Sequence, residues 1–358
     1  MTIPLLQPSC SHAELDAVRR VMLSGWWGNG PLCAEFEGEL ARRTGYAEVV
    51  TVNSATAALH LALLACGVGP GDQVIVPALT FVSTALAVSY TGATPVFADV
   101  DADTLAIDAE SVAQVVTSRT KAIIPVDYAG LPAHGPWANW GLPIIEDAAH
   151  APLMQHYGDF VVYSFHPVKP LATGDGGAVL LNDASTASRL RALRWCGIDR
   201  DTWARTQGRY GWDYAIEEIG YKYHWNDIQA AIGLEQLKRF RILLDRRREL
   251  AIRYCQELGT LDVLQLPAFS MDHCWHLFVV RTEAGLRNSL LDYLTTRGIS
   301  AGVHYKPLTY YAPYASQRTP EVTEREWRRL VTLPLYASMT DAQQSEVIDA
   351  ITDWSATV

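Results

Sequence analysis

The 358-residue sequence has few basic residues and no long apolar run. Lys and Arg number 29 against 39 Asp and Glu, which gives a formal net charge of −10. Such a chain has no overall attraction to phosphate backbones or anionic membranes, so we expect no nucleic-acid partner. No apolar stretch approaches the ~18 residues of a membrane span, and the N-terminal residues lack the basic-then-apolar pattern of a secretory signal. We therefore expect a cytoplasmic protein without membrane attachment.

Cysteine pairs and a dinucleotide fingerprint are also missing. The six cysteines show neither a CxxC pair nor zinc-like spacing, so we expect reduced thiols and no metal site. A nicotinamide-dependent sugar reductase or epimerase would need GxGxxG between a strand and a helix. Here "GNGPLC" lacks the last glycine and "GVGPG" follows a helix pattern, which disfavours that class.

The sequence does contain a regular alternation of strand-like and helix-like segments. Between about residues 47 and 195, seven Val- and Ile-rich runs alternate mostly with helix-period stretches, as in "EVVTVN" followed by "ATAALHLALLACG". This pattern predicts an α/β fold whose large domain, residues 1–240, holds a mostly parallel seven-stranded sheet between helices. A long amphipathic pattern from about residue 226 predicts a helix that joins it to a smaller α/β domain, residues 241–358. In that domain "SAGVHYK", residues 300–306, is strand-like.

Because ligands of such sheets bind at the carboxyl ends of the strands, the residues that follow each strand are the candidates. In "NSATAAL", Asn53, Ser54 and Thr56 lie between a strand and a helix, where amides and hydroxyls form an anion site or simply cap the helix. Phe81 follows the strand "QVIVP" and either covers a flat ligand or belongs to the core.

Two further segments carry charge. In "PIIEDAAHA", Glu146 and Asp147 end an apolar strand ahead of His150, and a carboxylate there needs a cation or a protonated nitrogen unless it caps a helix. In "SFHPVKPLATGDGG", Lys169 lies between two prolines that exclude a helix, and the glycines that follow allow close approach of a ligand. An exposed loop lysine is the alternative, although the flanking residues are rigid and apolar.

An anion site, an aromatic plate, a carboxylate and a fixed lysine form the set that pyridoxal phosphate requires. Its phosphate needs N–H and hydroxyl donors, its ring nitrogen needs an acid partner, and its aldehyde needs a lysine for a Schiff base. The four segments together therefore predict a pyridoxal-phosphate site.

The motifs in order resemble one family over almost the whole chain. They include "LSGWWGNGPLCAEFE", "NSATAALHLAL", "IIEDAAHA", "SFHPVKPLATGDGGAVLLND", "GYKYHWNDIQAAIGLEQL" and "GISAGVHYKPL". The sequence resembles the DegT/StrS-type sugar aminotransferases, which share the aspartate-aminotransferase fold.

The resemblance implies roles for individual residues. Lys169 would carry the cofactor and then move protons, Asp147 would face the ring nitrogen, His150 the phenolic oxygen and Phe81 the ring face. The phosphate would be held by Ser164, Ala55 and Thr56. Candidate substrate contacts are Trp27, Asn29, His304 and Tyr305. Relatives are at least homodimers with shared active sites, so residues of one subunit would complete the site of the other.

Three departures from the resemblance stand out. Many relatives carry Asn after "GY" and bind the neighbouring subunit's phosphate with it, whereas this chain has Lys222 there and His224 two positions on. Either residue is a candidate for that contact. Asp127 in "PVDYAG" stands where histidine is frequent, and the segment at residues 151–158 is shorter than usual.

The expected activity is transamination of a ketosugar, nucleotide-linked, with glutamate or a similar amino acid as donor. Two alternatives share the scaffold. A dehydratase of this family has histidine in place of the lysine, so Lys169 favours transamination. A non-catalytic regulatory protein would bind cofactor and sugar without turnover, and the joint presence of the lysine, the aspartate and the phosphate-site residues disfavours it.

Overall fold

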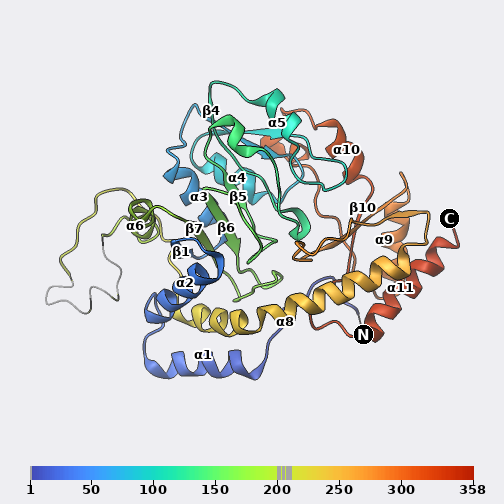
Figure 1. Ribbon diagram of the computed structural model, residues 1–358, viewed down its shortest axis with the longest axis horizontal. Helices are drawn as coiled ribbons and strands as arrows, with labels where there is room; N and C mark the ends of the chain where they lie inside the picture. Colours follow the sequence, from blue (N-terminus) through green and yellow to red (C-terminus); the bar gives the residue numbers. More distant parts are fainter. Residues whose placement is uncertain (1, 200–202, 204–205, 207–211) are drawn as a thin grey trace.

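A seven-stranded sheet forms the centre of the computed structural model, which describes residues 2–199, 203, 206 and 212–358 (Figure 1). Two hydrogen-bonded sets, β3-β2-β4 and β1-β7-β6-β5, are joined by the parallel bridges Ile123–Ile144 and Val126–Asp147. β7 is antiparallel to β1 and β6, and the other pairings are parallel, so the sheet is mostly parallel, as the sequence predicts. The strands are β1 (Glu48–Val52), β2 (Gln73–Pro77), β3 (Thr94–Ala98), β4 (Thr120–Ile123), β5 (Ile145–Asp147), β6 (Phe160–Ser164) and β7 (Gly177–Leu181).

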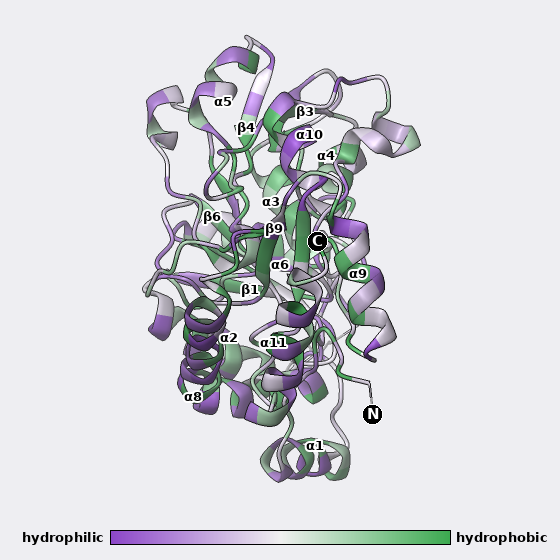
Figure 2. Cartoon of the chain, turned by 90° about the vertical axis from the view of Figure 1, so that its right-hand side faces the viewer, coloured by the Kyte–Doolittle hydropathy of each residue, from purple (hydrophilic) through white to green (hydrophobic). Residues whose placement is uncertain are grey.

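Helices cover both faces of this sheet because successive strand residues point to opposite sides. Val50 and Val52 of β1 pack in the core with α3 and α4, whereas Val49 packs in the core with α2 and α8. Figure 2 shows the apolar strands inside and the polar outer surfaces of the helices. The helices before α8 are α1 (His12–Ser24), α2 (Pro31–Thr44), α3 (Ala55–Ala65), α4 (Ser83–Tyr90), α5 (Ala109–Val115) and α6 (Ala184–Leu193), with the short 3₁₀ turns η1 (Tyr128–Gly130) and η2 (Trp137–Trp140).

The long helix expected from about residue 226 is α8 (Asp227–Leu258), which crosses the lower part of Figure 1. It begins at Asn226, whose side chain accepts a hydrogen bond from the amide of Gln229 at 3.0 Å. Leu237 packs in the core beneath the central sheet, and Tyr254 packs in a second core around β9. One helix therefore connects both cores.

The C-terminal residues form a second, antiparallel sheet, β10-β9-β8, in which both pairings are antiparallel. Helices α9 and α11 pack against each other and, with β10 and α8, enclose the second core. The elements after α8 are β8 (Leu264–Gln265), β9 (Phe278–Thr282), α9 (Arg287–Thr296), η3 (Leu308–Tyr310), η4 (Ala312–Tyr314), α10 (Glu321–Trp327), β10 (Leu330–Leu333) and α11 (Asp341–Ser355).

The strand predicted at residues 300–306 is wrong. A single bridge, Gly302–Thr332, remains of it. Beyond the bridge, the His304 side chain lies 2.9 Å from the Thr332 hydroxyl, and Tyr305 turns toward His150. The segment lines a cavity instead of extending the sheet.

Two expectations from composition can be compared with the structure. All six cysteines are free; Cys33 and Cys274 are buried, and Cys10 is exposed. In the part of the chain that the structure describes, no helix is both long and apolar enough to span a membrane.

Candidate active site

A cavity of about 290 Å³ opens at the carboxyl ends of the central strands. Most residues predicted for the site line it: Ala55, Thr56, Phe81, Asp147, His150, Ser164, Lys169, His304 and Tyr305. Ser54, Thr80, Ser83, Val126, Ala149, His166, Val168 and Asp175 complete much of its wall. Segments separated by more than 200 residues thus meet at one place, as the strand-end rule predicts.

Lys169 lies in the loop between β6 and β7. Its amide donates to the carbonyl of His166 at 2.9 Å, which makes a tight turn between the two prolines. Its Nζ lies 3.5 Å from Nε2 of His276. Burial lowers the pKa of the Lys169 amine to about 8, although the Asp147 carboxylate partly offsets the effect. Near neutral pH a much larger fraction of this amine is uncharged than of an ordinary lysine.

Asp147 ends β5 at the bottom of the cavity, with only 6% of its surface exposed. Its Oδ2 accepts a hydrogen bond from the Thr84 hydroxyl at 2.9 Å, and its Oδ1 accepts one from the amide of Ala149 at 3.3 Å. Burial raises the pKa of this carboxyl, whereas these two bonds and Lys169 lower it. Because burial outweighs these three interactions, a carboxylate that faces the cavity fits a protonated ring nitrogen as its partner.

The first turn of α3 lies at one end of the cavity. Ser54 caps this helix by accepting from the amide of Ala57 at 3.1 Å, which confirms the helix-cap interpretation of the "NSATAAL" segment. The amides of Ala55 and Thr56 belong to the helix N-terminus, where N–H groups lack helical partners. The Thr56 hydroxyl lies 2.8 Å from that of Ser83. Ser164 lines the same cavity.

Aromatic and imidazole rings form the walls. Phe81 is 54% exposed, so the alternative of a core phenylalanine is wrong. Its ring centroid lies 5.8 Å from that of Tyr305, whose hydroxyl lies 3.1 Å from Nε2 of His150. Nδ1 of His150 is buried without a hydrogen-bond partner in the described part of the chain. It is a polar atom that a bound ligand would satisfy.

Four residues that the family resemblance assigns to the site lie outside this cavity. Nζ of Lys222 stands 3.4 Å from the centroid of the Trp195 ring, and the ring of His224 lies 4.1 Å from it. Trp27 is 50% exposed, with its indole N–H donating to the carbonyl of Met22 at 3.2 Å. The carbonyl of Asn29 accepts from the indole of Trp26. Within one chain none of these four residues lines the cavity.

The sequence did not reveal two residues of the site. Thr84 is the second residue of α4, and the only sequence signal for it was that it follows Phe81 by three positions. His276 is a single histidine in the apolar run "CWHLFVVR", 107 positions from Lys169, and only the tertiary fold brings the two together. Burial, followed by the charge of Lys169, keeps the pKa of His276 well below its usual value, so its ring is neutral.

Comparison with known proteins agrees with this geometry. The model of the DegT/DnrJ/EryC1/StrS aminotransferase family matches residues 8–352. The chain belongs to this family. Members use pyridoxal phosphate, and a Streptococcus pneumoniae sugar aminotransferase homologue, Spr1654, is solved in both a PLP form and a PMP form.

Solved structures of the family superpose along the whole chain. The aminotransferase TlmJ from Streptoalloteichus hindustanus is 34% identical, with a TM-score of 0.93 and 100% of both chains covered. The PLP form of Spr1654 is 30% identical, with a TM-score of 0.90 over 100% of this chain and 99% of that one. The sugar aminotransferase CalS13 from Micromonospora echinospora is 30% identical, with a TM-score of 0.86 over 98% of this chain and 99% of that one. The family assignment confirms the fold and the cofactor predicted from the sequence.

Proposed function

We propose that this aminotransferase moves the amino group of an amino acid such as glutamate to a ketosugar carried on a nucleotide. The observation that carries the proposal is the convergence of Lys169, Asp147 and the α3 N-terminus on one cavity. Several solved relatives are described as sugar aminotransferases, which supports a sugar as acceptor. The nucleotide carrier and the donor are proposed from the family resemblance of the sequence.

The cavity offers a place for each part of the cofactor. In this proposal the amides of Ala55 and Thr56 and the hydroxyl of Ser164 hold the phosphate, because a helix N-terminus favours an anion. Phe81 covers one ring face, and Asp147 pairs with the ring nitrogen. His150 faces the phenolic oxygen. Bound there, pyridoxal phosphate supplies an aldehyde for a lysine amine and a ring that withdraws electrons from the reacting carbon.

Lys169 has two tasks in this proposal. Its amine would be the group that anchors the cofactor, and the same amine, once free, would be the base that takes a proton from the donor's Cα and the acid that gives it back. The lowered pKa of about 8 suits both, because the uncharged amine is the nucleophile and the base. The ionised Asp147 keeps the ring nitrogen protonated throughout. The second half-reaction reverses these proton movements on the sugar ketone.

The remaining residues serve substrate and assembly. His304 and Tyr305 line the cavity beside Phe81 and are proposed as sugar contacts. The exposed positions of Trp27 and Lys222 fit a shared site in a homodimer, in which Lys222 or His224 reaches the partner's phosphate. Sedimentation of the purified protein should then give the mass of two chains, and a single-chain mass would contradict the shared site.

The experiment runs the reaction backwards against a panel of amino-sugar nucleotides, with 2-oxoglutarate as acceptor. We expect one compound to be deaminated with formation of glutamate, and the Lys169→Ala variant should give none. If free aminosugars react and nucleotide-linked ones do not, the proposal that the sugar is carried on a nucleotide is wrong. If no aminosugar of either kind reacts although glutamate converts the cofactor to its amine form, the sugar acceptor is wrong.

A further inference from the structure

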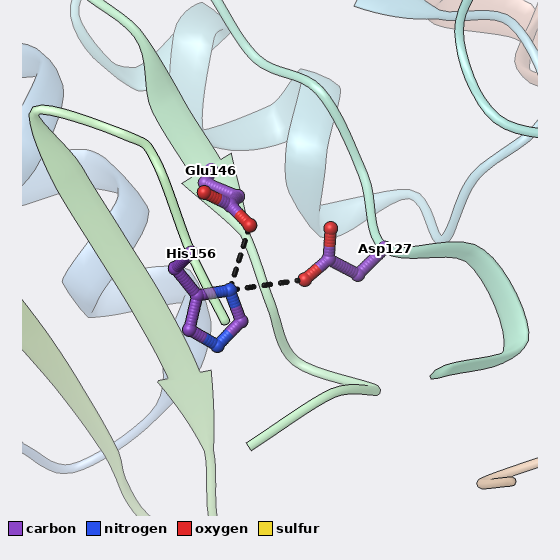
Figure 3. Close-up of side chains that lie close together, drawn as sticks. All are labelled: Asp127, Glu146 and His156. Carbon is purple, nitrogen blue, oxygen red and sulfur yellow. Dashed lines mark hydrogen bonds and ion pairs between the residues drawn. The ribbon is translucent and has the colours of Figure 1, made fainter. Parts of the chain in front are cut away.

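Three buried side chains, those of Asp127, Glu146 and His156, point toward one another beside β5 (Figure 3). Nδ1 of His156 lies 2.6 Å from Oε1 of Glu146 and 3.5 Å from Oδ2 of Asp127. The side chains of His156, Asp127 and Glu146 are 1%, 0% and 5% exposed. Glu146 precedes Asp147 in the strand, so the two carboxyls point to opposite faces. We call these three residues the Asp127 triad.

The triad and Asp147 are held by the same backbone. The amide of Asp127 donates to the carbonyl of Asp147 at 3.1 Å, and the amide of Asp147 donates to the carbonyl of Pro125 at 2.8 Å. This pair of bonds forms the Val126–Asp147 bridge, one of the two bridges that join the two halves of the central sheet. A displacement of Asp127 or Glu146 would therefore move the strand end that carries Asp147.

The hydrogen bonds distinguish the two carboxyls. Oε2 of Glu146 accepts from the amides of Tyr157 and Gly158, both at 2.9 Å, and its Oε1 lies 2.6 Å from His156. Three partners of this kind suit an ionised carboxylate. Oδ1 of Asp127 accepts from the amide of Ala133 at 2.8 Å, but its Oδ2 is buried without a hydrogen-bond partner among the described residues.

Charge makes the same distinction. The titratable groups that face Asp127 are Glu146, Asp147, His156, Tyr163 and Cys274. His156 alone in this set can be a cation, and it lies closer to Glu146. Burial, followed by the Glu146 carboxylate, raises the pKa of Asp127 well above its ordinary value. A third buried negative charge beside Glu146 and Asp147 would be unfavourable.

A metal ion fits the spacing less well than a proton. Ligand atoms about 2 Å from one cation normally lie ~3 Å or more from each other. The 2.6 Å between His156 and Glu146 is instead the length of a charge-assisted hydrogen bond.

We propose that Asp127 keeps its proton, that Glu146 is the carboxylate to which His156 donates, and that this triad positions Asp147 and leaves it the ionised carboxyl at the cavity. The residues of the triad are positioning residues, since they act on the reaction through Asp147. The claim that the triad positions Asp147 rests on the role proposed above for Asp147. The claim that Asp127 is protonated and Glu146 is ionised does not rest on it.

Substitution of Asp127 by Asn and by Ala tests the proposal. Asn keeps the size, remains neutral, accepts from Ala133 and donates where the acid would. Asp127→Asn should therefore keep the melting temperature of the cofactor-free protein and bind pyridoxal phosphate within about threefold of the wild type. Asp127→Ala leaves a cavity and an unpaired partner, and should weaken cofactor binding about tenfold or more. Glu146→Gln removes the charge that three donors share and should resemble the Ala variant.

Infrared difference spectra of the cofactor-free proteins, wild type minus Asp127→Asn, test the proton directly. At neutral pH we expect a protonated-carboxyl band that the Asn variant lacks. Loss of an ionised-carboxylate band instead, or an Asn variant as impaired as the Ala variant, would overturn the proposal. So would one equivalent of tightly bound metal per chain, measured by elemental analysis, whose removal reproduces the Ala variant. None of these readings requires turnover, so a wrong substrate would leave them unchanged.

Discussion

At the scale of single residues, the candidate site depends on how burial shifts the pKa values of Lys169 and Asp147. The sequence was sufficient to select Lys169 and Asp147 as candidates. Lys169 lies between two prolines and Asp147 ends an apolar strand, so neither charge is easily explained as an ordinary surface group. It was not sufficient for His276, since a single histidine in an apolar run gives no local signal. Its 3.5 Å contact with Lys169 exists only in the folded chain.

The shifted pKa of Lys169 has a measurable consequence. An amine reacts with acylating reagents only when deprotonated, so a lower pKa moves the onset of labelling to lower pH. In the cofactor-free protein, labelling of Lys169 should rise through about pH 8, against a midpoint near the ordinary value of 10.5 for the same lysine in denatured protein. Peptide mass spectrometry after labelling across a pH series measures both. Equal midpoints would show that burial does not lower this pKa.

At the scale of elements, the sequence predicted the strands of the central sheet well, but its prediction for residues 300–306 was wrong. The runs "EVVTVN" and "QVIVP" became β1 and β2 because Val and Ile suit strands buried on both faces. The strand expected at residues 300–306 does not form, since the His304 side chain contacts Thr332 of β10 and the Tyr305 side chain contacts His150 in the cavity. Such long-range contacts have no counterpart in local periodicity.

The contact between β7 and α3 allows a prediction for this scale. A Cβ at Gly177 would lie 2.6 Å from the amide nitrogen of Ala55. A side chain there would therefore push β7 away from the first turn of α3, where we propose that the phosphate binds. Gly177→Ala should lower the stability by about 1–3 kcal/mol and weaken binding of pyridoxal phosphate. Calorimetry and a cofactor titration measure the two effects.

Gly38, exposed in α2, is the matched control for Gly177. A Cβ there would meet nothing within 4 Å, so Gly38→Ala should raise the stability by up to about 1 kcal/mol and leave cofactor binding unchanged. If Gly177→Ala changed stability and cofactor binding no more than Gly38→Ala does, the close contact between β7 and α3 would not matter for phosphate binding.

At the scale of the whole molecule, α8 connects a core under the central sheet to a core around β9. We propose that these cores correspond to a large domain, residues 1–240, and a small one, residues 241–358. The division matters for function because His276, His304 and Tyr305 come from the C-terminal part, whereas Lys169 and Asp147 come from the central sheet. The site forms where the two parts meet.

The attachment of the cofactor to Lys169 is the central claim, and borohydride reduction tests it most directly. The holoenzyme is reduced, digested and mapped by mass spectrometry, with the Lys169→Ala variant treated in parallel. We predict that the yellow colour bleaches and that the cofactor's mass appears on the peptide containing Lys169. The variant should bind cofactor that washes away after reduction. Cofactor mass on another lysine, or on none, would contradict the account.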